Sequence, residues 1–345
     1  MRPPKEVKLK DVADALGVSV VSVSNALRGK KGVSEELRTR ICECAQRLGL
    51  DTEAYRAETK TAAEGQAPNH PVTIGVLVSV RYIAVGTSFY WEMYLKTANA
   101  ASARGCLTAL DIVEDDSDTP LPQMIRNHEV DGVIVIGPMR EQYLQKLLAA
   151  ADCPVVFMDE QVSDPRYSSV LSGNYYGMYR SVRELVRAGH KKIGFVGELS
   201  VSRNIIDRYY GYKKCMRENG LKIEQRWLLT DRAGDKEIPG IDLPEELPTA
   251  FACSSDFAAG VLYDALCKRG LKVPKDISIA SYDDYLIGHP LSGHLTTYHV
   301  DIEHMAKCAV KLVMREIRDP DAAGVMYEVD ADVVRRDSVR QITKG

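Results

Sequence analysis

Four histidines near the carboxyl end of the chain recur every five residues: His289, His294, His299 and His304. A histidine cluster suggests a metal site, because the neutral imidazole ring is a common metal ligand. A spacing of five residues, however, brings side chains together neither on one face of a helix nor on one side of a strand, and Pro290 and Gly293 interrupt the segment. We therefore expect no metal site here.

The sequence lacks the motifs of nucleotide and acyl chemistry. It contains no G-x-G-x-x-G, no phosphate-binding P-loop and no G-x-S-x-G nucleophile elbow. Its eight cysteines are scattered singly apart from one C-x-C, which indicates reduced, mostly buried thiols and neither disulfides nor zinc fingers. We expect a protein that is not an enzyme and that uses no cofactor.

The amino-terminal residues have the pattern of three short helices. Apolar residues at i, i+3, i+4 and i+7 predict a first helix that Gly17 ends: Leu9, Val12, Ala13 and Leu16. Ser19 can cap a second helix, on which Val20, Val23 and Leu27 are predicted to share the inner face. A third helix starts near Ser34 and has an inner stripe of apolar side chains: Leu37, Ile41, Cys44, Ala45 and Leu48. Three such helices are typical of a helix-turn-helix unit, whose second helix offers small side chains to base edges.

Charge is unevenly distributed along the 345 residues. The first 48 residues have a net charge of +4 and the remainder a net charge of −7, as for a nucleic-acid-binding head on an acidic body. No apolar run approaches the roughly 18–20 residues of a membrane span, and the amino terminus has no signal-peptide core. These features predict a soluble, cytoplasmic protein with no membrane partner.

Two further stretches follow the head. Residues 50–71 are polar and rich in alanine, glutamate and threonine, which is typical of a linker. From Val72 onward, strand-like runs alternate with amphipathic segments, the pattern of a parallel sheet covered on both faces. The predicted strands are 73–78, 107–113, 131–137, 154–160, 192–197, 249–254 and 277–283, and the predicted helices are 89–103, 140–151, 177–188, 205–219, 257–268 and 303–318. This body is larger than one open sheet usually needs, so we expect two lobes with a cleft between them.

The stretch LKDVADALGVSVVSVSNALRGKKGVSEELRTRI resembles the DNA-binding head of the LacI/GalR (lactose-repressor) family of bacterial transcription regulators. The body agrees, because VDGVIVIG, PVVFMDE, LVRAGHKKIGFVG, CSSDFAAGVLYDAL, VPKDISIASYDD and ADVVRRDSV resemble, in order, the family's effector-binding core. The implied fold is an all-α helix-turn-helix head (1–49), a linker or hinge (50–71) and an α/β core (72–345) of two doubly wound parallel sheets, similar to periplasmic binding proteins. By analogy, lobe one comprises about 72–163 and 296–322, and lobe two about 164–291 and 325–342, with three crossovers between them.

The resemblance implies a homodimer on a pseudo-palindromic double-stranded operator, regulated by a small molecule in the interlobe cleft. The DNA-binding residues it implies are Lys8, Leu9, Lys10, Ser19, Val20, Val21, Ser22, Ser24, Asn25, Lys30 and Lys31. Val20 and Val21 stand where the family varies to choose its operator, and they could contact thymine methyls or pack on sugars. Asn25 stands where many members have arginine; it can pair with adenine but cannot reproduce an arginine fork on guanine. Any one of the lysines alone could equally be plain solvated surface.

The linker departs from the family pattern. The family's hinge helix normally inserts a leucine into the minor groove, whereas the matching region here runs from Tyr55 to Thr59 without one. Three readings stay open: Tyr55 substitutes for the leucine, the protein bends DNA less, or the linker stays disordered.

The effector is expected at the carboxyl ends of the strands, where loops and helix starts converge. The implied residues are Ser79, Ser88, Tyr90, Trp91, Asp159, Arg208, Ser255 and Asp283. Ser255 stands where the family more often has asparagine, and Gly137 where a polar side chain sometimes occurs. The two aspartates would repel a phosphate, so an unphosphorylated sugar is favoured. For Tyr90 and Trp91 the alternative is ordinary core packing, and for the aspartates it is a capping or loop carboxylate.

Two functional classes remain at this point. One is an effector-responsive, operator-binding regulator, which we expect to repress sugar-utilisation genes, although activation stays open because the sign depends on where the operator lies. The other is a solute-binding or sugar-modifying protein with a vestigial head. The second class would predict a secretion signal or paired catalytic carboxylates, and neither is evident. The chain ends at Gly345 without a leucine-heptad tail, which predicts a dimer in place of a tetramer.

Overall fold

The computed structural model describes residues 9–27, 33–48, 50, 70–83, 88–233, 236–237 and 241–342. The chain forms two compact units that divide between Pro71 and Val72. In the described ranges, no helix has both the length and the apolar character needed to span a bilayer.

The amino-terminal unit contains three helices, α1 (Leu9–Leu16), α2 (Val20–Leu27) and α3 (Glu35–Leu48). Gly17 ends α1 with φ +65°, a conformation that favours glycine, and the Ser19 hydroxyl caps α2 by accepting from the backbone N–H of Ser22 at 3.0 Å. The helices bury a common core of small and branched side chains: Val12, Ala13, Val23, Ala26, Leu27, Ile41, Cys44, Ala45 and Leu50.

Two of the predicted inner residues of this unit are exposed. Val20 is 42 % exposed and Leu48 is 37 % exposed, so their placement on the inner faces was wrong. Each is the terminal residue of its helix, Val20 the first of α2 and Leu48 the last of α3, and neither belongs to the head core.

The first sheet of the second unit has six parallel strands in the order β13-β5-β4-β3-β1-β2. Its strands are β1 (Thr73–Ser79), β2 (Leu107–Val113), β3 (Gly132–Ile136), β4 (Val155–Met158), β5 (Ser168–Ser172) and β13 (Met326–Val329). Four helices belong to this lobe: α5 (Phe89–Ser102), α6 (Gln123–Arg126), α7 (Glu141–Ala150) and α11 (Ile302–Arg318). A short 3-10 turn, Val80–Tyr82, follows β1.

The second sheet has the order β14-β12-β11-β10-β6-β7 and is parallel except for β14, which runs antiparallel to β12. Its strands are β6 (Ile193–Val196), β7 (Leu228–Leu229), β10 (Ala250–Cys253), β11 (Ser278–Asp283), β12 (Thr296–His299) and β14 (Val333–Val334). Its helices are α8 (Asn174–Arg187), α9 (Arg203–Glu218) and α10 (Asp256–Lys268). A 3-10 turn (Gln225–Trp227) and a small hairpin of β8 (Arg232–Ala233) and β9 (Lys236–Glu237) complete this lobe.

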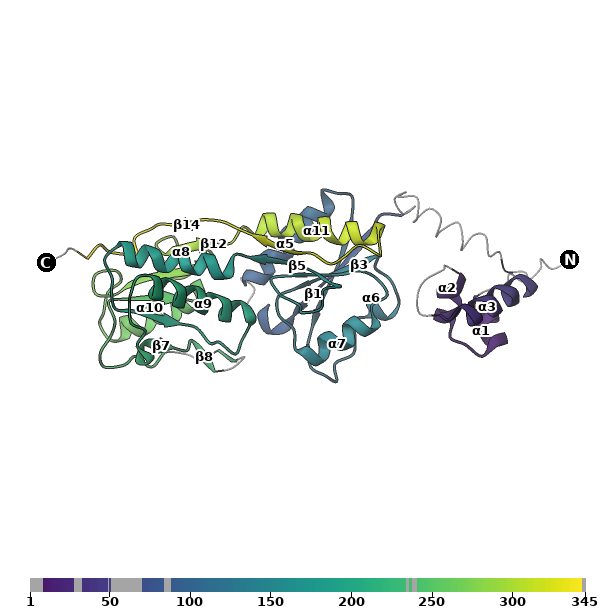
Figure 1. The fold of residues 1–345 in the computed structure, drawn as a ribbon, viewed down its shortest axis with the longest axis horizontal. Helices are drawn as coiled ribbons and strands as arrows, with labels where there is room; N and C mark the ends of the chain where they lie inside the picture. Colours follow the sequence, from purple (N-terminus) through teal and green to yellow (C-terminus); the bar gives the residue numbers. More distant parts are fainter. Residues whose placement is uncertain are drawn as a thin grey trace. The chain divides into compact units, whose positions relative to one another are not determined.

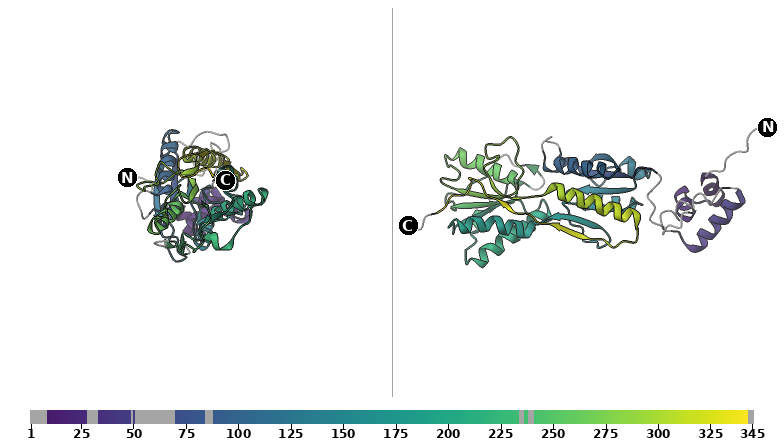
Figure 2. Two further views of the ribbon diagram at one scale, coloured as in Figure 1. Left: turned by 90° about the vertical axis from the view of Figure 1, so that its left-hand side faces the viewer. Right: turned by 90° about the horizontal axis from the view of Figure 1, so that it is seen from above.

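The two lobes of the core lie end to end, and the carboxyl-terminal segment runs from one to the other (Figures 1 and 2). The chain passes between the sheets three times: after β5, between β12 and α11, and between β13 and β14. All the strands and helices predicted for the core are present, with end points shifted by at most a few residues.

The expected lobe limits differ from this topology. The strand at 168–172 lies in the first sheet, 296–299 lies in the second, and 326–329 lies in the first, so the limits 72–163 with 296–322 and 164–291 with 325–342 cut at the wrong places. The strand β5, SSVLS, has a weak hydropathy signal because its serines are buried through hydrogen bonds: Ser168 donates to Glu316 of α11 at 2.5 Å and accepts from the Val325 N–H at 2.9 Å.

Candidate functional site

The carboxyl ends of the strands of lobe one face lobe two, and polar side chains from both lobes meet there. From lobe one, Asp159 follows β4 directly with φ +62° and is buried. Its Oδ2 accepts a hydrogen bond from the Tyr90 hydroxyl at 3.0 Å. Tyr90 lies in the first turn of α5, which Ser88 caps by accepting from the Trp91 N–H at 3.1 Å. The cap therefore fixes the start of α5, from which the Tyr90 hydroxyl reaches Asp159.

Gly137, at the end of β3, makes room for the Tyr90 ring. Its φ is +73°, and a Cβ at this position would lie 2.6 Å from Cε1 of Tyr90. Any larger residue would displace the ring. The Tyr90 ring thus occupies the space that a side chain at position 137 would need.

Lobe two contributes Arg208 of α9, which is 5 % exposed and has four partners. Its Nε donates to Asn174 Oδ1 at 2.7 Å, and its Nη1 donates to the Ser254 carbonyl at 2.8 Å and to Asp283 Oδ1 at 3.2 Å. Its guanidinium carbon lies 3.8 Å from the ring centre of Tyr282. The ring and the hydrogen bonds hold the guanidinium in one plane.

Direct contacts join the two halves of this cluster. Asn204 of α9 donates to the Asp159 carbonyl at 2.9 Å and accepts from Asn174 Nδ2 at 3.1 Å. The Phe89 ring of α5 meets the Tyr285 ring of lobe two edge to face, with centroids 5.8 Å apart. The lobes are therefore in contact across the site in this structure.

Three aspartates of the site have raised pKa values. Burial raises the pKa of Asp159 to about 6, against the opposing effects of the Arg208 charge and the Tyr90 hydrogen bond. Burial also raises the pKa of Asp283 to about 8, although Arg208 opposes the shift, and that of Asp256 to about 7. Near neutral pH these groups can accept or donate hydrogen bonds, which suits hydroxyl groups and disfavours anions.

Two buried polar atoms at the site lack hydrogen-bond partners among the described residues: Asp159 Oδ1 and Ser254 Oγ. A buried polar atom without a partner costs free energy, so each needs a donor or acceptor from outside the chain to be satisfied. The cluster therefore has the properties of a binding site for a polar ligand.

A second set of contacts links this cluster to the crossovers. The Tyr282 ring, on which Arg208 packs, stacks on Tyr298 with centroids 4.8 Å apart, and its hydroxyl donates to Ser172 at 3.0 Å, where β5 ends. The Tyr298 hydroxyl donates to Asp330 Oδ1 at 3.0 Å and accepts from the Ala331 N–H at 2.7 Å, between β13 and β14. Tyr282 thus connects Arg208 to Ser172 at the crossover after β5 and, through Tyr298, to the crossover between β13 and β14.

The structure brings together four of the eight predicted effector residues: Tyr90, Asp159, Arg208 and Asp283. The hydroxyls of Ser88 and Ser255 cap α5 and α10. Ser79 has no exposed surface, and its hydroxyl donates to Asp115 at 2.8 Å, a carboxylate that Arg81 also binds. Trp91 packs against Tyr94 at 5.3 Å.

Sequence reasoning missed Asn174, Asn204 and Tyr282. The two asparagines occupy the first turns of their helices, where capping is the ordinary expectation, so nothing in the residue pattern indicates that they bind an arginine and a carbonyl. The four histidines do not converge, because His289, His294 and His299 each contact a different aspartate and His304 lies beside Tyr327.

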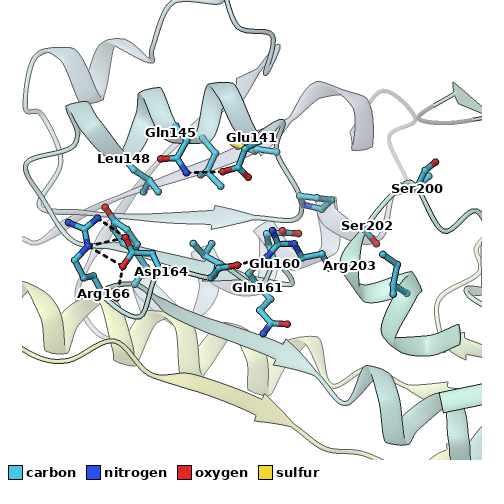
Figure 3. A pocket seen from close by; sticks show the side chains of 18 of the residues that line it. Glu141, Gln145, Leu148, Glu160, Gln161, Asp164, Arg166, Ser200, Ser202 and Arg203 are labelled. Atoms are coloured by element: carbon cyan, nitrogen blue, oxygen red, sulfur yellow. Dashed lines mark hydrogen bonds and ion pairs between the residues drawn. The ribbon is translucent and has the colours of Figure 1, made fainter. Parts of the chain in front are cut away.

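A pocket of about 870 Å³ lies beside this cluster and is walled by both lobes (Figure 3). Lobe one supplies α7 and the segment after β4, and lobe two supplies the segment that leads into α9. Arg203 spans the two, since its Nη1 donates to the Gln161 carbonyl at 3.2 Å and to Ser163 Oγ at 3.0 Å. The volume is within the usual range of small-molecule sites.

In the head, the start of α2 presents an apolar surface. Val20 and Val21 are 42 % and 46 % exposed, and the hydroxyls of Ser19 and Ser22 lie 2.9 Å apart beside them. Lys10 is exposed, Leu9 packs partly against the head core, and Ser24 and Asn25 are half-buried. Lys8, Lys30, Lys31 and the linker from Tyr55 to Thr59 lie outside the described residues.

Two family models match the chain: "Bacterial regulatory proteins, lacI family" over residues 8–51 and "Periplasmic binding protein-like domain" over residues 182–339. The transcriptional repressor PurR of Aliivibrio salmonicida is 27 % identical over 341 residues, covering 97 % of this chain and 99 % of the relative. PurR of Actinobacillus pleuropneumoniae is also 27 % identical, over 350 residues, covering 97 % and 99 %.

Solved structures share the fold at lower identity. A complex of the transcriptional regulator CelR with cellobiose has a TM-score of 0.62 at 19 % identity and covers 98 % of this chain and 100 % of its own. The lac repressor dimer bound to operator and the anti-inducer ONPF has a TM-score of 0.61 at 22 % identity, covering 97 % and 100 %. A LacI-family regulator from Enterococcus faecium with bound ribose has a TM-score of 0.62 at 19 % identity, covering 79 % and 100 %.

The helix-turn-helix head and the two-lobed core define a class of protein, a DNA-binding regulator with a periplasmic-binding-protein-like ligand domain. The head of this chain matches the lacI family of bacterial regulatory proteins, and the relatives that match along nearly its whole length are transcriptional repressors.

Proposed function

We propose that this chain is a cytoplasmic repressor of the lacI family that binds operator DNA as a homodimer, and that an uncharged sugar held between the lobes sets its affinity for DNA. The observation that carries the proposal is the cluster of Asp159, Tyr90, Arg208 and Asp283 at the junction of the lobes. A ligand held there contacts both lobes at once, so its binding differs between open and closed forms. Such a difference in affinity is what couples ligand binding to a conformational equilibrium.

The chemistry of the cluster supports a neutral polyhydroxyl ligand. Asp159 Oδ1 can accept from a hydroxyl, and the Asp159 carboxylate, which is ionised above its pKa of about 6, disfavours a phosphate placed beside it. Neighbouring structures contain cellobiose and ribose. These ligands belong to those proteins, and they support a sugar for this one.

The edge of the first sheet supports the dimer. Strand β2 is one of the two edge strands, and three large apolar side chains on it and on the adjoining helix α5 are exposed: Leu95, Leu107 and Ile112. Exposed apolar side chains along a sheet edge favour pairing with a second copy. Sedimentation of the full chain at micromolar concentration tests this, and a monomer or a tetramer would contradict it.

Binding of the full chain to fragments of its own upstream region tests the repressor. We expect sequence-preferring binding that weakens steeply as salt is raised, because phosphate contacts release counterions. A thermal-shift panel of sugars, sugar phosphates and nucleobases tests the effector, since a ligand at 100 times its Kd adds about 2.7 kcal/mol to the unfolding free energy. Absence of preferential DNA binding rejects the repressor, and a shift seen only with phosphorylated compounds or nucleobases rejects the neutral sugar.

Replacement of Val20 and Val21 by serine is expected to weaken operator binding by about 1–3 kcal/mol, because apolar contacts to thymine methyls or sugars are lost. Both side chains are exposed, so the fold of the head should survive, which far-UV circular dichroism checks. Competition between operator fragments measures the loss. The matched control is Lys10→Ala, which removes a surface charge and should weaken binding equally on all sequences. Equal losses on operator and non-operator DNA for the valine variant would exclude direct readout by these side chains.

A further inference from the structure

The interlobe pocket beside the Asp159 cluster has no role yet in the proposed function. None of the four clustered effector residues lines it. Its walls come instead from α7, from residues 160–167 after β4 and from residues 199–206 before and in α9 (Figure 3). The space therefore begins where the cluster ends, since Glu160 follows Asp159 and Ile206 precedes Arg208 on α9 by two residues.

Tyr90 explains why the open space lies on this side. Its ring fills the space beside Gly137, and its hydroxyl donates a hydrogen bond to Oδ2 of Asp159. A ligand that reaches Asp159 is thus blocked on the α5 side while the tyrosine is in place. The pocket on the α7 side is the direction in which a ligand larger than one ring can extend.

Glu160 supplies the polar group that this space needs. Its Oε2 is buried and has no hydrogen-bond partner in the described part of the chain, and burial foremost raises its pKa to about 7. Arg203 opposes that shift, but its Nη1 donates to Gln161 and Ser163 and not to the carboxylate. Because Oε2 has no exposed surface, a ligand hydroxyl satisfies it once the carboxyl group of Glu160 turns toward the pocket that this residue lines.

The remainder of the lining matches a sugar ring that has one apolar face and a polar edge. Leu144, Leu148 and Ile206 offer an apolar surface, while Gln145 and Ser202 offer donors and acceptors. The side-chain amide nitrogen of Gln145 donates a hydrogen bond to Glu141 Oε1 at 2.8 Å. Acidic side chains outnumber basic ones in the lining (Glu141, Glu160 and Asp164 against Arg166 and Arg203), which makes an anionic ring unfavourable there.

We propose that this pocket is a second subsite, which seats the distal ring of an uncharged two-ring glycoside whose first ring binds at Asp159 and Arg208, with Glu160 accepting a hydroxyl of the distal ring. The proposal rests on the proposed function, because it extends the same ligand. It also assigns the second ring a regulatory role. The ring would touch α7 of lobe one and the start of α9 of lobe two, so it would favour the closed form more than a single ring does.

Calorimetric titration of the full chain with matched sugars tests the subsite: glucose against cellobiose, galactose against lactose, and xylose against xylobiose. For a sugar that binds, we expect the two-ring compound to bind about tenfold tighter or more than its single ring, as for one added hydrogen bond to a carboxylate. Leu148→Arg, which places a long side chain in the pocket, should remove that advantage and leave the affinity for the single ring unchanged. Glu160→Gln should reduce the advantage by a smaller factor, because an amide oxygen still accepts.

The matched control is Gln142→Arg, an exposed position on α7 outside the pocket, which should leave both affinities unchanged. Thermal melting of each variant checks that it is folded. If Leu148→Arg does not fold, Glu160→Gln provides the test of the subsite. Equal affinities for one ring and two, or a two-ring advantage that survives both variants, would overturn the subsite alone. If no sugar in the panel binds while operator binding persists, the sugar effector fails and the subsite fails with it.

Discussion

Replacement of Arg208 by alanine is expected to lower the free energy of unfolding of the core by about 3 kcal/mol or more, the usual cost of removing one partner from a buried charged network. The loss comes from several sources at once. Asn174 Oδ1 and the Ser254 carbonyl lose their donors, and Tyr282 loses the guanidinium that packs on its face. Asp283 contributes less, because a carboxyl whose pKa is raised to about 8 even beside the arginine is mostly protonated at neutral pH.

The same variant should lose its response to the effector by about 10–100-fold in affinity, the effect of removing hydrogen bonds from a charged donor. Operator binding should persist, since the head has its own core. Denaturant titration and ligand calorimetry measure the two effects. Arg217→Ala, an exposed position on the same helix, is the control for the loss of a charge from α9. A cost below about 1 kcal/mol would show that Arg208 is not an integral part of a packed network.

The alternation of strands and helices was readable from the sequence because both faces of each sheet are covered. A strand buried on both sides is a continuous apolar run, as in VIVI of β3, and such a run is recognisable without knowledge of its neighbours. The helix-turn-helix was also readable, because its signals are local. The Ser19 cap and Gly17 at φ +65° act within one turn of the residues that they fix.

The sequence does not show which strands belong to which lobe. That assignment depends on which strands pair with one another, and strand pairing leaves no mark in the composition of a segment. Strand β5 has the length of an ordinary strand but carries three serines. The burial of one of them, Ser168, depends on hydrogen bonds with Glu316 of α11 and with the Val325 N–H just before β13. The candidate site divides in the same way. Asp159, Arg208 and Asp283 were predicted because the family resemblance aligns them, whereas Asn174, Asn204 and Tyr282 join the site through contacts between segments that are far apart in sequence.

The free energy of unfolding of the core is expected to fall as pH rises from about 6.5 to 8, the reverse of a protein stabilised by ionised carboxylates. Burial raises the pKa of Asp283 to about 8 and those of Asp256 and Glu160 to about 7, so the folded chain holds protons that the unfolded chain has released. A raised pKa of this kind contributes stability below the pKa of the unfolded chain, near 4, and that contribution is lost as pH rises through the folded value. Asp283 alone should account for about 2 kcal/mol between pH 6 and 8, at about 1.4 kcal/mol for each proton released per pH unit.

Other titrating groups do not cancel this slope in the same window. Burial lowers the pKa of His190, which makes stability rise with pH, but only below the unfolded histidine value of about 6.5. The lowered pKa of Asp115 acts below about pH 4. Denaturant midpoints measured from pH 6.5 to 8 should therefore decrease for the wild-type chain and should be distinctly flatter for Asp283→Asn, which cannot ionise. Asp118→Asn, at an exposed aspartate in the segment between β2 and α6, should keep the wild-type slope. A wild-type midpoint that rises over this range would mean that Asp283 is ionised at neutral pH and bound to Arg208 as a full ion pair, in which case the site would hold two carboxylates against one cation and would favour a ligand that carries a positive charge.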